Sequence, residues 1–333
     1  MAKNNITENP IMEFHLFAGI GGGIYGGQLL GHQCCGSVEI DDFCNKILEQ
    51  RQKDGWMEKF DIFGDLTKLN GNDFKGKFDV LCGGFPCQAF SHAAHGKNIA
   101  EKNLWPEMFR FAQESDAPVI FGENVVLKAI EKAKLDLESI GYKVERCKVS
   151  CGELGADHRR DRYWLLAVKD DSVFAQIAKH DSALPKLEAH CWQMSPHDKT
   201  IQIEATDLRQ QLKAIGNAQS PYAAATAFRV LVNRHLFHKY SSPQANEKEI
   251  LEVFNRQDSW IKNKYGEGFG LIHTPTTMAN YSAPSMMKHQ GCRNFVEVFG
   301  KPHPVNAEYL MGFPQGASSR NPQTIDLYKI WKH

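Results

Sequence analysis

The sequence predicts an α/β fold built on a doubly wound parallel sheet, with a smaller and irregular second domain. Between residues 12 and 170, short apolar runs alternate with amphipathic segments. The first apolar run ends in a glycine-rich turn, and a later run ends in Gly83 and Gly84. This alternation, with tight turns at the strand ends, is typical of strands and helices that wind in order around one parallel sheet.

The individual elements follow from the same pattern. The runs that we expect to form strands cover residues 12–17, 34–40, 78–84, 118–125, 142–150 and 162–168. The segments that we expect to form helices cover residues 23–30, 41–52, 104–114 and 126–141. In the last of these helices, apolar side chains recur every three or four residues, which is the period of a helix with one buried face.

The pattern loosens after residue 170. Residues 171–205 show no clear periodicity, 208–240 is helical again around Gly216 and Pro221, and 249–333 is rich in turn-forming residues. We therefore assign residues 12–170 and 206–240 to the sheet domain. We assign residues 171–205 and 249–333 to the smaller domain, and 241–248 to a linker.

Composition narrows the class of protein. The chain has 333 residues, and its 39 Lys and Arg balance its 39 Asp and Glu, which excludes a uniformly basic protein but not a local basic face. Nine cysteines occur without a CxxC pair, as expected for free thiols in the cytoplasm. The polar N-terminus predicts no signal peptide, and the absence of long apolar runs predicts no membrane span.

A glycine-rich turn, FAGIGGG at residues 17–23, links the first strand to the first helix. Glycines at Gly19, Gly21 and Gly22 let the backbone approach a ligand, and the helix start offers N–H groups to an anion. Glu39 follows 20 residues after Gly19, at the end of the next strand, where a carboxylate can accept hydrogen bonds from a ribose hydroxyl pair.

Two further residues extend this ligand site. Ile40 can pack against a purine, and Asp65 in GDLTKL can accept a hydrogen bond from an exocyclic amine. Together with the glycine turn, they predict a cofactor that contains adenosine. The spacing alone leaves NAD and S-adenosylmethionine both open.

A cysteine and an acid are expected at the same edge of the sheet. Cys87 lies in GGFPCQAFS, just after the strand at 78–84, and ligands bind at this edge in open α/β sheets. A thiol there is a candidate nucleophile, and the alternative is a small buried apolar residue. Glu123, in GENV, ends the neighbouring strand.

A basic motif, HRRDRYW, spans residues 158–164. Arg160 and Arg162 alternate along a strand, so we expect them to point to one face. Two guanidinium groups on one face suit a phosphate or a base carbonyl, and the alternative is an exposed basic strand.

These motifs, in this order, resemble those of the DNA (cytosine-5-)-methyltransferases. The resemblance is carried by FAGIGG, GFPCQ, ENV, the RxR pair and IGNAQSP, and it covers residues 14–168 and 212–230. It implies a Rossmann-like, S-adenosylmethionine-dependent methyltransferase domain with a smaller target-recognition domain. The cofactor contacts that it implies, together with the turn residues above, are Phe17, Ala18, Gly19, Ile20, Gly21, Gly22, Glu39, Ile40, Asp65, Pro86, Leu104 and Asn217.

The resemblance also implies a catalytic set. Cys87 would add to carbon 6 of cytosine, and Glu123 would hold or protonate ring nitrogen 3. Arg162 would contact the base carbonyl, and Arg160 would support the nucleophile loop or a phosphate. The target base would be flipped out of the duplex, and no metal is required.

The expected partner is double-stranded DNA, with a cognate restriction endonuclease as a further candidate, and we expect a cytoplasmic monomer. Alternatives are a relative that methylates tRNA, a binding module without catalysis and a nicotinamide dehydrogenase. The phenylalanine before Pro86 and the intact catalytic set favour the DNA enzyme.

Two features depart from the family pattern. The usual glutamine before the arginine pair is His158. The sequence AEYLMGFPQG, which resembles a motif that normally precedes the GN motif, lies after it at residues 307–316. This order predicts a rearranged C-terminal region that builds much of the recognition domain.

Overall fold

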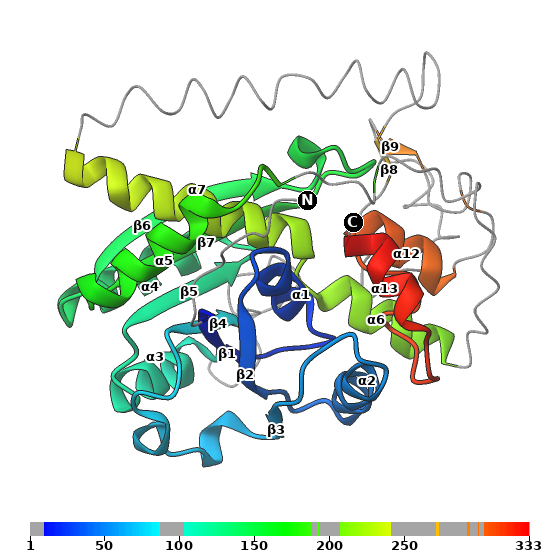
Figure 1. Ribbon diagram of the computed structural model, residues 1–333, viewed down its shortest axis with the longest axis horizontal. Helices are drawn as coiled ribbons and strands as arrows, with labels where there is room; N and C mark the ends of the chain where they lie inside the picture. Colours follow the sequence, from blue (N-terminus) through cyan, green and yellow to red (C-terminus); the bar gives the residue numbers. More distant parts are fainter. Residues whose placement is uncertain are drawn as a thin grey trace.

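The computed structural model describes residues 10–86, 103–187, 192, 207–240, 271–272, 292–293, 299 and 303–332. Its main feature is a seven-stranded sheet with the order β3-β2-β1-β4-β5-β7-β6 (Figure 1). The strands are β1 (Met12–Leu16), β2 (Gln33–Val38), β3 (Asp61–Phe63), β4 (Val80–Gly84), β5 (Val119–Asn124), β6 (Lys143–Ser150) and β7 (Asp161–Val168).

The sheet is mixed rather than wholly parallel. β7 runs antiparallel to both β5 and β6, whereas the other neighbouring pairs are parallel. β6 and β7 are joined by a short connection that includes the turn at Gly152–Leu154, and such a connection has room only for an antiparallel return. The expectation of a parallel sheet is therefore wrong at this strand, and the short edge strand β3 was not expected.

Helices cover both faces, which confirms the doubly wound arrangement. They are α1 (Gly22–Leu29), α2 (Asp42–Lys53), α3 (Trp105–Glu114), α4 (Leu127–Ser139), α5 (Asp171–Ala183), α6 (Leu208–Asn217), α7 (Pro221–Tyr240), α12 (Pro304–Met311) and α13 (Ile325–Lys332). Alternate strand residues enter two different cores: Val80 and Cys82 pack with α1 and α7, whereas Leu81 packs with α3 and α4. Among the described helices, none is long and apolar enough to span a bilayer.

Helix α5 lies where we expected irregular structure. Asp170 caps it by accepting from the backbone N–H groups of Ser172 and Val173. Phe174, Ile177 and Ala178 face the core at helical spacing, and α5 packs on α7. The buried face continues with His180 and Asp181, which are polar, so apolar residues alone do not mark the helical period.

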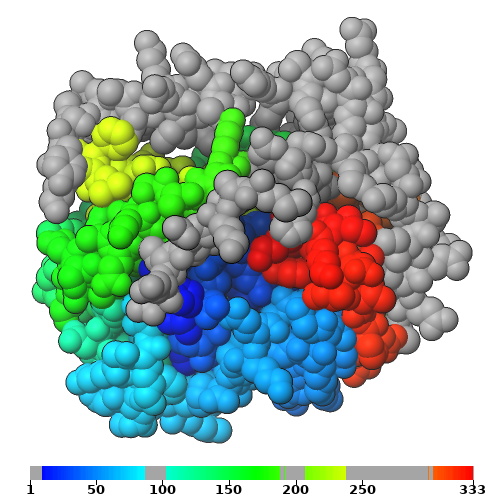
Figure 2. Space-filling view, viewed as in Figure 1, coloured from blue at the N-terminus to red at the C-terminus, as the bar shows by residue number. Residues whose placement is uncertain are grey.

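The C-terminal segment 303–332 also differs from expectation, because it joins the core of the sheet domain. Arg51 of α2 is fully buried and donates to the carbonyl oxygens of Gly316 and Asn321, at 2.7 Å each. Trp331 packs edge-on against Tyr25 of α1, with ring centroids 5.5 Å apart. Figures 1 and 2 show this segment, in red, against the blue N-terminal elements.

The predicted division into two domains stays a prediction, although these contacts join described C-terminal residues to the sheet domain. The described parts of 171–205 and 249–333, apart from the short pairing of β8 (Leu271–Ile272) with β9 (Cys292–Arg293), pack on the sheet domain. In GFPQG, the buried Glu308 accepts from the N–H groups of Gly316 and Ser318, so the motif closes on itself. It is a structural turn of the same core.

Candidate active site

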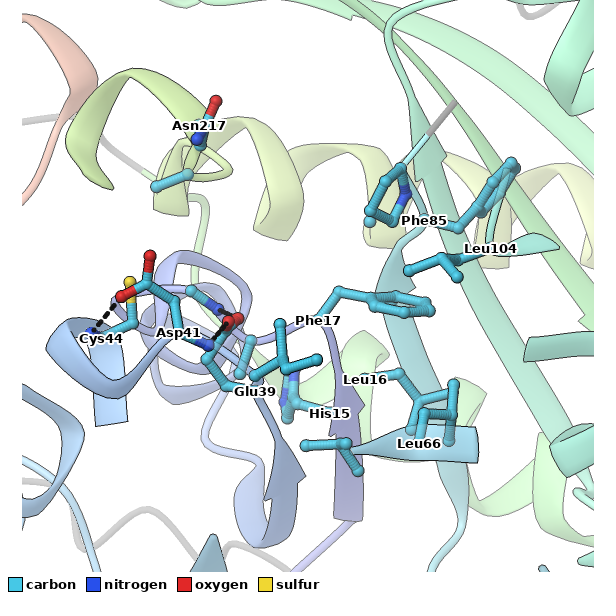
Figure 3. Close-up of a pocket in the computed structure, with 18 of the residues that line it drawn as sticks. His15, Leu16, Phe17, Glu39, Asp41, Cys44, Leu66, Phe85, Leu104 and Asn217 are labelled. Carbon is cyan, nitrogen blue, oxygen red and sulfur yellow. Dashed lines mark hydrogen bonds between the residues drawn. The ribbon is translucent and has the colours of Figure 1, made fainter. Parts of the chain in front are cut away.

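A cavity of about 660 Å³ opens where β1, β2, β4 and β5 end. Its volume is in the range of sites that bind small molecules. The predicted cofactor residues that line it come from six separate segments: Phe17, Ala18, Gly19, Glu39, Ile40, Asp65, Pro86, Leu104 and Asn217. Figure 3 shows Glu39 to one side of this cavity, Leu104 and Phe85 to the other, and Asn217 reaching it from α6.

The glycine turn has an unusual backbone. Phe17, Gly19 and Gly21 all have positive φ, at 55°, 54° and 87°. For Phe17 this conformation is strained, and the hydrogen bond from the next N–H, of Ala18, to the Val38 carbonyl helps to hold it. Gly21 is the N-cap of α1 and supplies no side chain, so the first turn of α1 keeps N–H groups for a ligand.

Three of the predicted cofactor residues do not line the cavity. Ile20 is fully buried in the core. A Cβ at Gly21 would lie 2.6 Å from Met57, and one at Gly22 would lie 2.1 Å from the carbonyl oxygen of Gln219. These two glycines therefore permit close packing of the protein on itself, rather than close approach of a ligand.

Glu39 links the glycine turn to the start of α2 through two hydrogen bonds. Its Oε2 accepts from the Gly19 N–H at 2.6 Å, and its Oε1 accepts from the Asp41 N–H at 2.8 Å. Burial raises the pKa of Glu39, although these backbone hydrogen bonds counteract the rise. Each carboxylate oxygen retains acceptor capacity for a ribose hydroxyl.

Ile40 and Asp65 flank the same opening. The Ile40 side chain is 74% exposed, which leaves its apolar surface free for a flat ligand. Asp65 Oδ1 caps a short helix at Leu66–Lys68 by accepting from the N–H and hydroxyl of Thr67, and these hydrogen bonds lower the pKa of Asp65.

Glu123 lines the cavity, and Arg162 contacts its carboxyl group from the neighbouring strand. Their strands, β5 and β7, are neighbours in the sheet. Arg162 Nε lies 3.1 Å from Glu123 Oε1, and both side chains are less than one-fifth exposed. The structure thus brings together the predicted acid and one arginine of the pair.

Arg160 is engaged elsewhere. It is buried, and its Nη2 donates to the carbonyl oxygens of Gly216 and Ala218 at 3.1 and 2.7 Å. It therefore anchors the GN motif at the end of α6. The support of the nucleophile loop or the phosphate contact that we expected for Arg160 stays a prediction.

His158 is the residue that departs from the family pattern. It is fully buried, and within the described part of the chain neither ring nitrogen has a hydrogen-bond partner. Burial, together with the positive charges of Arg160 and Arg162, lowers its pKa to about 3. His158 is therefore neutral at pH 7.

Cys87 lies outside the described residues, but the chain on both sides of it is fixed at the cavity. Asn124 Nδ2 donates to the Phe85 carbonyl oxygen at 2.9 Å. The Leu104 N–H donates to the Pro86 carbonyl oxygen at 3.2 Å. The residue before Cys87 therefore lines the cavity, on the side of Glu123.

A buried polar group under the glycine turn was not expected. Glu13, His15 and Cys82 each place a donor atom within 4.8 Å of the others. Both Glu13 oxygens, however, already contact imidazoles: Nε2 of His15 at 2.9 Å and Nδ1 of His32 at 2.7 Å. Burial raises the pKa of Glu13, but His32 and His15 outweigh it and lower the pKa to about 2. We interpret the group as a buried carboxylate–imidazole network.

Sequence reasoning missed other residues of the cavity. His15, Phe43, Lys213 and Gln219 line it but belong to none of the predicted sets. Only Gln219 carried a signal, because it lies inside the IGNAQSP motif beside Asn217.

Comparison with known proteins identifies the family of the chain. Residues 11–318 match the family described as C-5 cytosine-specific DNA methylase. The Type II methyltransferase M.MspI of Moraxella sp is 30% identical over 179 residues, 49% of this chain and 40% of that protein. M.HgiCII of Herpetosiphon aurantiacus, also a Type II methyltransferase, is 27% identical over 264 residues, 72% of this chain and 59% of that protein. The matches thus span about half the length of these relatives.

Among solved structures, the S. pombe Dnmt2 methyltransferase aligns over 97% of this chain and 93% of its own. The identity is 15% and the TM-score is 0.47, a similarity too low to support an inference about the site.

Proposed function

Because the chain belongs to the C-5 cytosine-specific DNA methylase family, we propose that it transfers a methyl group from S-adenosylmethionine to carbon 5 of cytosine in double-stranded DNA. The observation that carries this proposal is Glu123, paired with Arg162, at one end of a cavity whose other end is built by the glycine turn and Glu39. One cavity therefore holds an acid that can contact a pyrimidine ring and a site that can bind a nucleoside.

The residues present fit S-adenosylmethionine. The first turn of α1 can receive its carboxylate, Glu39 its ribose hydroxyls, and the exposed face of Ile40 its adenine. When bound, the cofactor supplies an electrophilic methyl group on a sulfonium.

The nucleophile of the proposed reaction is Cys87. Carbon 5 of cytosine is a poor nucleophile until a thiolate adds to carbon 6 and pushes the electron pair of the C5–C6 bond onto carbon 5. The residue before Cys87 in the sequence, Pro86, lines the cavity, which supports this assignment. After transfer, a base removes the carbon 5 proton, and the thiolate leaves as the double bond re-forms.

Glu123 and Arg162 manage the charge that develops in the ring. Glu123 donates a proton to ring nitrogen 3 as the thiolate adds, which neutralises the negative charge on the base. The carboxylate that remains is stabilised by Arg162 Nε beside Oε1. Arg162 Nη1 donates to the Asp161 carbonyl oxygen, which fixes the direction of the guanidinium.

Bisulfite sequencing of DNA from cells that express the protein tests the proposal. We expect protected cytosines within a fixed flanking sequence, and no protection with Cys87→Ser. Purified protein should also become covalently trapped on DNA that carries 5-fluorocytosine when S-adenosylmethionine is added. Equal methylation by Cys87→Ser, or methylation confined to tRNA in a parallel assay, would contradict the proposal.

The finer expectations stay proposals of the same kind. We propose that the enzyme flips its target base, because ring carbon 6 cannot be reached inside a duplex. A partner endonuclease, a monomeric state and a cytoplasmic location stay predictions from the sequence.

A further inference from the structure

One glutamine, Gln219, fills the space beside three glycines of the active site. A Cβ at Gly22 would lie 2.1 Å from its carbonyl oxygen, one at Gly23 2.6 Å from its Oε1, and one at Gly84 2.8 Å from its Nε2. Side-chain carbons do not approach other atoms so closely. Gly22 and Gly23 begin α1, and Gly84 ends β4, so Gln219 sits between the cofactor turn and the entrance to the nucleophile loop.

The Gln219 side chain also reaches the proposed acid. Its Nε2 donates to Glu123 Oε2 at 3.5 Å, while Arg162 Nε faces Oε1 of the same carboxyl group at 3.1 Å. A carboxyl group with a donor beside each oxygen has one preferred orientation. Gln219 and Arg162 together therefore determine where Glu123 points.

The backbone around Gln219 is held in place. Arg160 binds the carbonyl oxygens of Gly216 and Ala218, just before it. Pro221 begins α7 just after it, and α7 packs on α1. The amide of Gln219 is therefore displayed from a rigid corner between two helices.

We propose that Gln219 is a positioning residue for methyl transfer, which aligns Glu123 with the cofactor turn. This inference rests on the proposed function. Methyl transfer requires the reacting atoms to lie in line at about 3–3.5 Å, and small misplacements are costly. Gln219 packs against Gly22 and Gly23 of the glycine turn and donates to Glu123. It therefore fixes the position of the Glu123 carboxyl group relative to the glycine turn.

Two substitutions of similar length separate the polar role from packing. Gln219→Met retains the length of the side chain but removes its amide, and we expect kcat to fall about 30-fold. Gln219→Glu has the same shape but turns a carboxylate oxygen toward Glu123, and we expect a larger fall. The Kd for S-adenosylmethionine should stay within about threefold of wild type in both, because neither substitution changes the glycine turn. Gln176→Met, on the exposed surface of α5, is the matched control.

A double-mutant cycle tests the packing part of the proposal. Gly23→Ala should impair the wild-type protein, because its Cβ would meet Gln219 Oε1. In a Gln219→Ala background, the same change should cost much less activity, because the contact at 2.6 Å is removed and His15 Nδ1, at 3.2 Å, becomes the nearest atom.

The outcomes are distinct. Steady-state methyl transfer to duplex DNA gives kcat, and calorimetry gives the Kd for S-adenosylmethionine. A kcat for Gln219→Met within twofold of the control overturns the proposal, as does a parallel loss of kcat, cofactor binding and melting temperature, which marks a purely structural residue. Additive losses in the cycle overturn it as well. If the wild-type protein transfers no methyl group to DNA, the proposed function itself fails and the positioning role falls with it.

Discussion

The two ends of the cavity are built in different ways. At the end that we propose for the cofactor (the cofactor end), the carboxylate of Glu39 accepts hydrogen bonds from the N–H groups of Gly19 and Asp41, and the carboxylate of Asp65 accepts from Thr67. These partners lie 2 to 20 residues away along the chain. At the end that we propose for the target nucleobase (the base end), Glu123 accepts a hydrogen bond from Gln219, 96 residues away. Arg160 donates to the carbonyl oxygens of Gly216 and Ala218, which are 56 and 58 residues away.

The base end also carries buried polar atoms that the described chain leaves without hydrogen-bond partners. They include both ring nitrogens of His158 and the Nε of Arg160. Such atoms cost free energy in the folded protein unless something pairs with them. The acids of the cofactor end are thus satisfied by groups that are near in the sequence, whereas the polar groups of the base end depend on distant parts of the chain and are more vulnerable to substitution.

The largest effect on activity is expected from a substitution at the base end, at Arg162. We expect Arg162→Ala to lower kcat about 100-fold or more, because Glu123 loses the cation beside Oε1 while charge develops on the base. Cofactor affinity, measured by calorimetry, should change less than about twofold. Arg159→Ala removes a neighbouring arginine that is largely exposed, and its kcat should match wild type. A parallel loss of cofactor binding in Arg162→Ala would show that the two ends are not independent.

His158 makes the base end sensitive to acid. Its pKa is about 3 in the folded protein and about 6.5 in an unfolded chain, so below pH 6.5 only the unfolded chain gains this proton. Stability is therefore lost as pH falls from 6.5 toward 3, by about 2 kcal/mol at pH 5.

Substitution of His158 by glutamine, the usual residue of the family, should remove this loss. Urea unfolding at pH 7.5 and pH 5 measures the effect. We expect the stability of His158→Gln relative to wild type to improve by about 2 kcal/mol between the two values of pH. An unchanged difference between the two proteins would show that His158 gains its proton equally in the folded and unfolded chains.

A substitution at Glu39 tests the hydrogen bonds of the cofactor end. An amide has one acceptor oxygen, so in Glu39→Gln either Gly19 or Asp41 loses the acceptor for its N–H. We expect the Kd for S-adenosylmethionine to rise about tenfold, which corresponds to one hydrogen bond. The kcat at saturating cofactor should stay within about twofold of wild type. A large fall in kcat would mean that the glycine turn also positions the base end.

The smallest effect is expected at the rim of the cofactor end. Lys213 of α6 lies 3.6 Å from Asp41, but its side chain is 58% exposed, and such ion pairs contribute less than about 1 kcal/mol. Lys213→Ala should leave the cofactor Kd within about threefold of wild type at physiological salt. A tenfold rise would assign Lys213 a direct contact with the ligand.

The cofactor end is easier to predict from the sequence than the base end, because its hydrogen bonds join residues that are close along the chain. The turn at Gly19, the acid at Glu39 and the exposed Ile40 depend on local geometry, namely strand ends and tight turns, which residue types specify directly. The antiparallel β7 and the partners of Arg160 depend on pairing between distant segments, on which local periodicity carries no information.

The glycines show the limit most clearly. Gly21 and Gly22 belong to the same motif as Gly19, but the space beside them is occupied by Met57 and Gln219 rather than left for a ligand. A motif names the residues that must be small, but not what fills the space. Likewise, the motif around Phe313 was recognisable in the sequence, but its place beside Tyr25 became evident only from ring packing across the core.

The buried guanidinium of Arg51 has a consequence for how the protein is made. Its acceptor on Asn321 is translated 270 residues later, which at ribosomal speed is a delay of roughly 15 to 55 s. Until then, the buried guanidinium has Asp54 and the ring of Trp56 as partners but lacks its two carbonyl acceptors. The helix that carries Arg51 therefore cannot complete its packing until residues 316–321 have been translated.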